Sequence, residues 1–201
     1  MNIEKEFLAE ESGVDIGEAI YNEENKQPME LDLYGWFPPE NEETLARLIK
    51  ENNIKTVLEI GCFLGKSTKF FVEQGCTVIS IDTFEGAKDI NASAEVQKRL
   101  PTMYEQFMFN LKELGIEDKV TVFKGTSEKS HDQYGFTADL IFIDGSHEYE
   151  DVKKDINMWF SRANKVLCGD DYTGVHPQVK QAVDELLPKA NKNQRVWYVI
   201  K

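Results

Sequence analysis

Residues 56–68 read TVLEIGCFLGKST, and this stretch decides the fold. Its first five residues are mostly β-branched or apolar, which is typical of a buried strand. A loop containing Gly61 and Gly65 follows at once, and a helical pattern begins at Lys66. A strand that turns through glycines into a helix is the opening unit of a parallel α/β sheet.

The same alternation continues along the chain. Further strand-like runs lie at 77–81, 120–123, 139–143, 165–168 and 196–200, and helical patterns at 41–53, 66–74, 101–114, 148–161 and 177–187. Such alternation predicts an α/β fold, a doubly wound, Rossmann-like, mostly parallel sheet of six to seven strands with helices on both faces. After Pro188 only one strand, 195–200, is expected.

The glycine loop excludes two common nucleotide motifs. A Walker A loop has four residues between its first glycine and Gly-Lys-Ser, whereas only three stand between Gly61 and Gly65. A GxGxxG pattern is also absent, because position 63 is Phe. An E-x-G-x-x-x-G loop remains, starting at Glu59, whose amides suit a carboxylate or hydroxyls. The alternative is a strand–helix turn that merely requires glycine.

Asp82 ends the second strand, 21 positions after Gly61. A carboxylate at this spacing binds the ribose hydroxyls in nucleotide-binding α/β folds. The spacing therefore favours ribose binding over a helix cap.

The charge of the chain is strongly acidic. Its 201 residues carry 36 acidic and 23 basic side chains, a net charge of −13. This balance disfavours a nucleic-acid partner, which needs clustered Lys and Arg. It favours a small molecule, alone or brought with a cation. No membrane span or secretion signal is expected, and three cysteines without CxxC spacing fit a reducing, cytoplasmic location.

The N-terminal residues differ from the rest. Residues 1–52 hold 14 acids and four bases, and little periodicity precedes Pro39. We predict an acidic arm or lid over 1–39, ending in the aromatic run YGWFPP, and a single domain over 40–201. Trp36 and Phe37 would form either a lid or an anchor for the arm. The oligomeric state is left open, a homodimer being one possibility.

Three blocks of sequence carry a family resemblance. Glu59, Gly61 and Gly65 with Asp82 resemble motifs I and II of class I S-adenosylmethionine (SAM)-dependent methyltransferases. Residues 110–127 are similar to the adenine-side segment of metal-dependent O-methyltransferases of the catechol and caffeoyl-CoA type. Residues 138–155, with IDGSHEYEDVKKD, and 169–172 resemble the macrocin O-methyltransferase (methyltransferase family 24) group. The resemblance covers roughly 54–188.

Three acids follow neighbouring strands. Asp144 ends the fourth strand, and Asp170 and Asp171 end the fifth, so all three should project into one crevice. Carboxylates in this arrangement suit Mg²⁺ or Mn²⁺, and the related O-methyltransferases carry metal-binding acids here. The alternative is that they cap the following loop and helix.

His147 lies three residues after Asp144 and is predicted either to act as general base or to be a surface residue. His131 and His176 have no comparable setting and are expected at the surface. A ferrous site of two histidines and one carboxylate is not expected, because it needs a second well-placed histidine.

The resemblance implies methyl transfer from SAM to a substrate oxygen. The acceptor would be a small hydroxylated molecule, a sugar or vicinal diol, and His147 and Asp144 would be catalytic. Mg²⁺ or Mn²⁺ would bind Asp144, Asp170 and Asp171. The cofactor-binding residues would be Glu59, Gly61, Phe63, Gly65, Ser67, Asp82, Thr126, Ser127 and Asp144. The alternative is a non-catalytic module that binds a nucleoside or the cofactor on the same fold.

Overall fold

The computed structural model describes residues 29–87 and 93–201. Within them, one mixed sheet has the strand order β3-β2-β1-β4-β5-β7-β6. All pairings from β3 to β5 are parallel, whereas β7 is antiparallel to both of its neighbours. The strands are β1 (Thr56–Ile60), β2 (Thr77–Asp82), β3 (Val120–Lys124), β4 (Ala138–Ile143), β5 (Ala163–Gly169), β6 (Asn191–Asn193) and β7 (Val196–Ile200).

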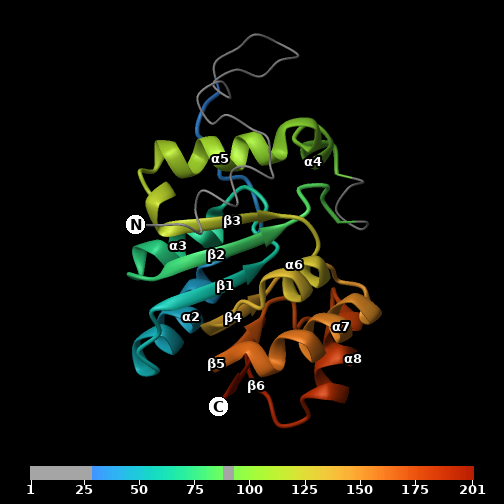
Figure 1. Cartoon of the computed structure of the whole chain (residues 1–201). Coiled ribbons are helices and arrows are strands. Elements are labelled where there is room, and N and C mark those ends of the chain that lie inside the picture. The colour runs from blue at the N-terminus through green and yellow to red at the C-terminus, as the bar shows by residue number, and fades with distance from the viewer. Residues whose placement is uncertain (1–28, 88–92) are drawn as a thin grey trace.

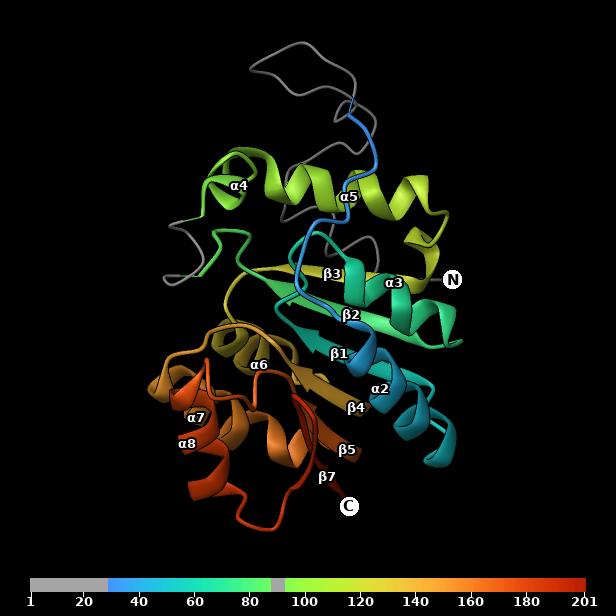
Figure 2. The ribbon, with the colours of Figure 1, turned by 180° about the vertical axis from the view of Figure 1, so that it is seen from behind.

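Helices cover both faces of this sheet, as Figures 1 and 2 show from opposite sides. The α-helices are α2 (Pro39–Glu51), α3 (Lys66–Glu73), α4 (Ala94–Gln97), α5 (Met103–Glu113), α6 (Ser127–Tyr134), α7 (Tyr149–Trp159) and α8 (Pro177–Leu186). Short 3-10 turns occupy Leu100–Thr102, Glu117–Lys119 and Phe160–Arg162. The predicted doubly wound α/β architecture is therefore confirmed. In the described ranges, no helix combines the length and apolarity that crossing a membrane requires.

Two cores lie on opposite faces because successive strand residues point to opposite sides. Val57 packs with apolar side chains of α2, α3, α4 and α5, while its neighbour Leu58 packs with those of α7 and α8. Strands buried on both faces explain why the sequence shows continuous apolar runs instead of a two-residue alternation.

Strand order reverses between β1 and β4, so the chain leaves their carboxyl ends in opposite directions (Figure 1). Gly61 stands at this point with φ of +86°, and a Cβ on it would lie 2.1 Å from the carbonyl oxygen of Asp144. Glycine is therefore required here for two reasons, the positive φ of the turn and the close approach of the Asp144 carbonyl. Ligands of doubly wound sheets bind in the crevice at such a switch point.

The C-terminal edge corrects one prediction. Two strands follow Pro188, because Asn191–Asn193 pairs with Val196–Ile200 in an antiparallel hairpin. The Asn-Lys-Asn strand is short and polar at the sheet edge, so it carries no apolar signal in the sequence. Its turn, with Gln194 at φ of 55°, places Arg195 near the carboxyl end of β5.

The predicted N-terminal arm falls partly outside the described residues, since 1–28 are not among them. Residues 29–38 run across α5, where Asn110 donates to the carbonyl of Asp32 at 2.6 Å and Arg99 pairs with its carboxylate at 2.7 Å. Figure 2 shows this segment in blue in front of α5. Phe37 is 3% exposed and packs against Phe70 at 5.4 Å between ring centroids, so it anchors the segment to the domain.

Candidate active site

A cavity of about 1050 Å³ opens above the carboxyl ends of the parallel strands. Its walls come from the glycine loop after β1, the ends of β2 and β4, the loops after β3 and β5, and the 29–38 segment. Most of the predicted site residues line it, namely Gly61, Phe63, Ser67, Asp82, Thr126, Ser127, Asp144, His147 and Asp171. Three predicted residues, Glu59, Gly65 and Asp170, lie behind this wall.

The glycine loop is tied to the second strand by one carboxylate. Asp82 accepts the backbone N–H of Phe63 at 2.8 Å and that of Phe84 at 2.7 Å. Phe63 has φ of 49° and Phe84 has φ of 59°, unusual values for residues other than glycine. Asp82 thus holds two strained turns in place while its side chain borders the cavity.

Glu59 supports the loop from below. It is fully buried and accepts hydrogen bonds from the hydroxyls of Ser67, Thr68 (2.5 Å) and Ser80 (3.2 Å). Burial raises the pKa of Glu59 to about 7, against the lowering effect of these hydroxyls. Glu59 therefore joins the start of α3 to β1 and β2. It contacts the cavity only indirectly, by holding the hydroxyl of Ser67, which lines it.

The loop after β3 leads into α6, and its residues form one wall of the cavity. Thr126 caps α6 by accepting the N–H of Lys129 at 3.2 Å. Ser127 donates to Asp155 at 2.5 Å and accepts the indole N–H of Trp159 at 2.7 Å. Burial raises the pKa of Asp155 to about 6. These contacts fix the loop on α7.

An acid cluster stands between β4 and β5. Single oxygens of Asp144, Asp170 and Asp171 all lie within 4.8 Å of one another. Burial and the charges of the other two acids raise the pKa of Asp144 well above its usual value. The structure therefore brings the three acids together at the strand ends, but only Asp144 and Asp171 border the cavity, whereas Asp170 was also expected to project into it.

Arg195 is a member of this cluster that the sequence prediction missed. It pairs with Asp170 through Nε (3.0 Å) and Nη2 (3.2 Å), and Nη2 also contacts Asp171. The other contacts of Asp170 come from the side-chain amide of Asn41 (2.7 Å) and the N–H of Asp171 (2.6 Å). Asp170 is therefore buried and supplied with four hydrogen bonds.

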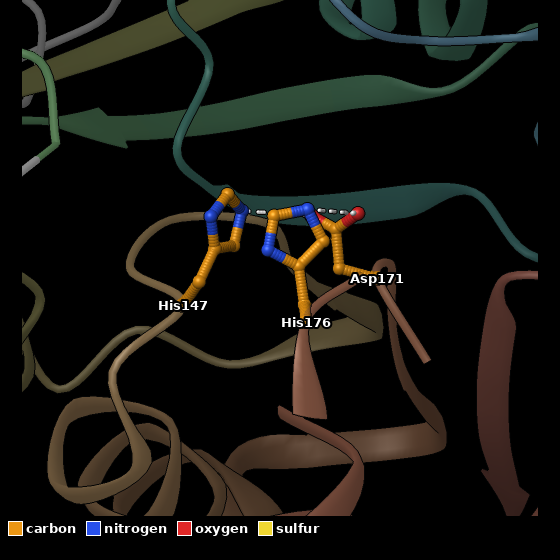
Figure 3. Close-up of side chains that lie close together, drawn as sticks. All are labelled: His147, Asp171 and His176. Atoms are coloured by element: carbon orange, nitrogen blue, oxygen red, sulfur yellow. Dashed lines mark ion pairs between the residues drawn. The ribbon is translucent and has the colours of Figure 1, made fainter. Parts of the chain in front are cut away.

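Two histidines lie side by side at the carboxylate of Asp171 (Figure 3). Nε2 of His147 lies 2.7 Å from Oδ2 of Asp171, and Nε2 of His176 lies 3.6 Å from Oδ1. The two imidazole rings are 4.0 Å apart between centroids. The expectation that His176 is a surface residue away from the site is wrong, because the loop after β5 folds back and brings it beside His147. His131, by contrast, pairs with its neighbour Asp132 at 3.0 Å.

The histidines and Arg195 determine the charge state of Asp171. Burial acts to raise its pKa, but the hydrogen bond and charge of His147, with the charges of His176 and Arg195, leave it below the usual value. Asp171 is therefore ionised at neutral pH.

Aromatic side chains from the 29–38 segment and the glycine loop form part of the cavity rim. Trp36 is 49% exposed and lies 6.0 Å from Phe63 and 5.4 Å from Tyr34 between ring centroids. Arg99 sits 4.3 Å above the ring of Tyr34. Trp36 thus contributes to the rim, whereas Phe37 is an anchor.

Comparison with known protein families identifies the family of this chain. Residues 58–172, more than half of the chain, match the family model described as "Methyltransferase domain". The chain belongs to this family. The expected class I SAM-dependent methyltransferase is thereby confirmed, and the matched residues run from β1 through the glycine loop to the acids after β5. A search of curated proteins finds no match.

Solved structures share the fold at low sequence identity. An O-methyltransferase from Bacillus cereus in complex with SAH (S-adenosylhomocysteine) has 16% identity and a TM-score of 0.60, with 85% of this chain and 84% of that one covered. The O-methyltransferase TomG from Streptomyces achromogenes, in complex with SAM, has 14% identity and a TM-score of 0.58, with 100% and 99% covered. SAH-bound PaMTH1 from Podospora anserina has 15% identity and a TM-score of 0.56, with 80% and 76% covered.

Proposed function

We propose that this methyltransferase transfers the methyl group of SAM to a hydroxyl of a small acceptor. The observation that carries the proposal is a single cavity with the glycine loop and Asp82 on one side and the His147–Asp171 pair on the other. One wall suits a nucleoside with a carboxylate tail, and the other suits removal of a proton.

The cofactor would bind along the glycine loop. Backbone amides at the start of α3 and the Ser67 hydroxyl would face its methionine carboxylate. Asp82 would accept hydrogen bonds from the ribose hydroxyls, and Thr126 and Ser127 would flank the adenine. The rim aromatics Trp36 and Phe63 offer apolar surface beside the loop.

His147 would act as the general base. Its Nε2 donates to Asp171, so this carboxylate orients the ring and leaves Nδ1 as the basic nitrogen. Bound SAM would supply the methyl group and would depart as neutral S-adenosylhomocysteine, its sulfur keeping the electron pair of the broken carbon–sulfur bond. His147 would take the proton of the acceptor hydroxyl as the new oxygen–carbon bond forms.

The acid cluster fits a divalent cation in its donor chemistry. Oxygens of the three carboxylates lie within 4.8 Å of one another. Burial and the charges of the neighbouring acids raise the pKa of Asp144, and the charge of Arg195 offsets this only in part. Asp144 and Asp171 face the cavity, and Asp170 would contribute after Arg195 yields one of its contacts. A bound Mg²⁺ or Mn²⁺ would lower the pKa of an acceptor hydroxyl.

The acceptor class follows from the size and charge of this region. A cavity of about 1050 Å³ exceeds what the cofactor needs, and the acids and imidazoles on its wall are hydrogen-bond partners for hydroxyls. We therefore propose a sugar or another vicinal diol. The neighbouring acids also disfavour a nucleic-acid backbone.

A methyl-transfer assay with methyl-labelled SAM and a set of sugars and catechols tests the proposal. Label should appear in an acceptor, more of it with Mg²⁺ than without, and His147→Gln should abolish most of the transfer while SAH binding stays intact. Normal SAH binding without transfer to any acceptor would instead support the non-catalytic cofactor-binding module.

A further inference from the structure

His147, Asp171 and His176 form a cluster that the proposed methyl transfer does not fully use. Each offers a metal-ligating atom, and these atoms lie within 4.8 Å of one another. The side chains are 17%, 7% and 23% exposed and all border the same cavity, so an ion can reach them from solvent. Figure 3 shows both imidazole rings beside the carboxylate.

The separations suit direct coordination. Ligand atoms bound at about 2.0–2.2 Å to a tetrahedral or octahedral ion lie about 3.0–3.5 Å apart. The separations are 2.7 Å from Nε2 of His147 to Oδ2 of Asp171 and 3.6 Å from Nε2 of His176 to Oδ1, so they fall on either side of this range. Movements of a few tenths of an ångström by these half-buried rings would therefore complete the set.

The backbone presents Asp171 in an unusual way. Its φ is 60°, in the left-handed region that non-glycine residues rarely adopt. The N–H of Thr173 donates to the carbonyl of Asp171 at 2.7 Å, and that of Tyr172 to the carbonyl of Arg195 at 2.9 Å, which hold the turn closed. Strain at a turn that aims a carboxylate between two imidazoles is typical of a functional position.

His176 is fixed by the same loop. It immediately precedes Pro177, the first residue of α8, and its N–H lies 3.4 Å from the hydroxyl of Thr173. The proline restricts the backbone of His176, which limits where its ring can lie before any ion binds.

We propose that His147, Asp171 and His176 bind one borderline divalent transition-metal ion of the Zn²⁺ or Co²⁺ type. Two imidazoles and one carboxylate favour such ions over Mg²⁺ and Ca²⁺, which prefer oxygen ligands. This ligand set differs from the three-acid set but shares Asp171 with it. If the proposed function is correct, the ion occupies the general base and blocks turnover, so the site inhibits the enzyme.

Calorimetric titration of the untagged chain with Zn²⁺, and visible absorption with Co²⁺, test the site. We expect one ion per chain and at least a tenfold loss of affinity in both His147→Ala and His176→Ala, since each removes one of three ligands. His131→Ala is the matched control, because His131 lies elsewhere beside Asp132. The three cysteines are buried, so thiolate bands should be absent from the Co²⁺ spectrum.

Thermal unfolding of His176→Gln, a milder variant, checks that lost binding is not lost folding. Unchanged Zn²⁺ affinity in folded His176→Ala or His176→Gln, or no binding by the wild type, would overturn the proposal. Its failure is distinct from failure of the proposed function, because SAH binding and methyl transfer are measured separately without added transition metal.

Discussion

Arg195 and Asp170 form a two-point ion pair across 25 positions of sequence, with Nε–Oδ1 of 3.0 Å and Nη2–Oδ2 of 3.2 Å. Asp170 is only 2% exposed, so its charge depends on this partner. The pair connects the C-terminal hairpin to the end of β5. It also supplies a fixed positive charge to the acid cluster.

Arg195→Gln should lower the free energy of unfolding by about 2–4 kcal/mol, because it leaves a buried carboxylate without its cation. Urea unfolding at neutral pH measures this loss. The double variant Arg195→Gln/Asp170→Asn should recover much of it, since the uncompensated charge is then absent. A single variant as stable as wild type would contradict the role given to Arg195.

Gly61→Ala should be far more disruptive than Gly75→Ala. Both glycines have φ near +85°, but a Cβ at Gly61 would meet the carbonyl oxygen of Asp144 at 2.1 Å, whereas nothing lies within 4 Å at Gly75. Gly75→Ala should cost about 1 kcal/mol from backbone strain alone, and Gly61→Ala several times more. Equal losses in chemical unfolding would show that β1 and β4 are less close than described.

Asp155 should give the stability a definite pH dependence. Its pKa is raised from 3.8 to about 6 by burial, so the folded state holds the proton more tightly than the unfolded state. Protonated Asp155 therefore stabilises the folded state fully at pH values below its pKa in the unfolded chain. This contribution is lost as the pH rises through about 6, its pKa in the folded state.

Asp155→Asn removes this titration, so its stability relative to wild type should increase by about 1 kcal/mol between roughly pH 5 and pH 7.5. Urea unfolding of both proteins at the two pH values measures the difference between their free energies of unfolding. Because both proteins contain Glu59, its similar pH dependence cancels in this difference. A difference that shrinks with rising pH would contradict the assigned direction.

Methyl transfer should depend on His147 much more than cofactor binding does. Replacing a general base lowers turnover by about 10²–10⁴-fold, so His147→Gln should fall in that range. Asp171→Asn should show a smaller loss with an altered pH profile, because it disturbs the orientation of His147. SAH affinity that drops in parallel with turnover would place His147 in the cofactor site instead.

The sequence predicts the fold and the site residues that follow the strands for one physical reason. Parallel strands end at the same edge, so Asp82, Asp144 and Asp170 can be placed from strand ends alone. Spacing predicts Glu59 as a cofactor-binding residue, whereas the structure places it fully buried beneath the glycine loop. Spacing alone does not distinguish a carboxylate that supports a loop from one that binds a ligand.

The residues that were missed or misjudged come from segments with no periodic signal. Arg195 lies in the turn of a hairpin whose first strand is Asn-Lys-Asn, and Asn41 reaches Asp170 over 129 positions. His176 ends a loop that folds back over the sheet, and its approach to His147 depends on the strained turn at Asp171. Such long-range polar contacts are set by tertiary structure.

Calorimetric titration with S-adenosylhomocysteine, with and without Mg²⁺, tests the central claim most directly. The wild type should bind in the micromolar range, and Asp82→Ala should bind at least about tenfold more weakly, because it loses the proposed ribose-binding carboxylate and the hydrogen bonds from the Phe63 and Phe84 amides. Asp132→Ala, an exposed carboxylate away from the cavity, should bind as the wild type does. No binding by the folded wild type under any metal condition, or equal affinity in Asp82→Ala, would contradict the cofactor site described above.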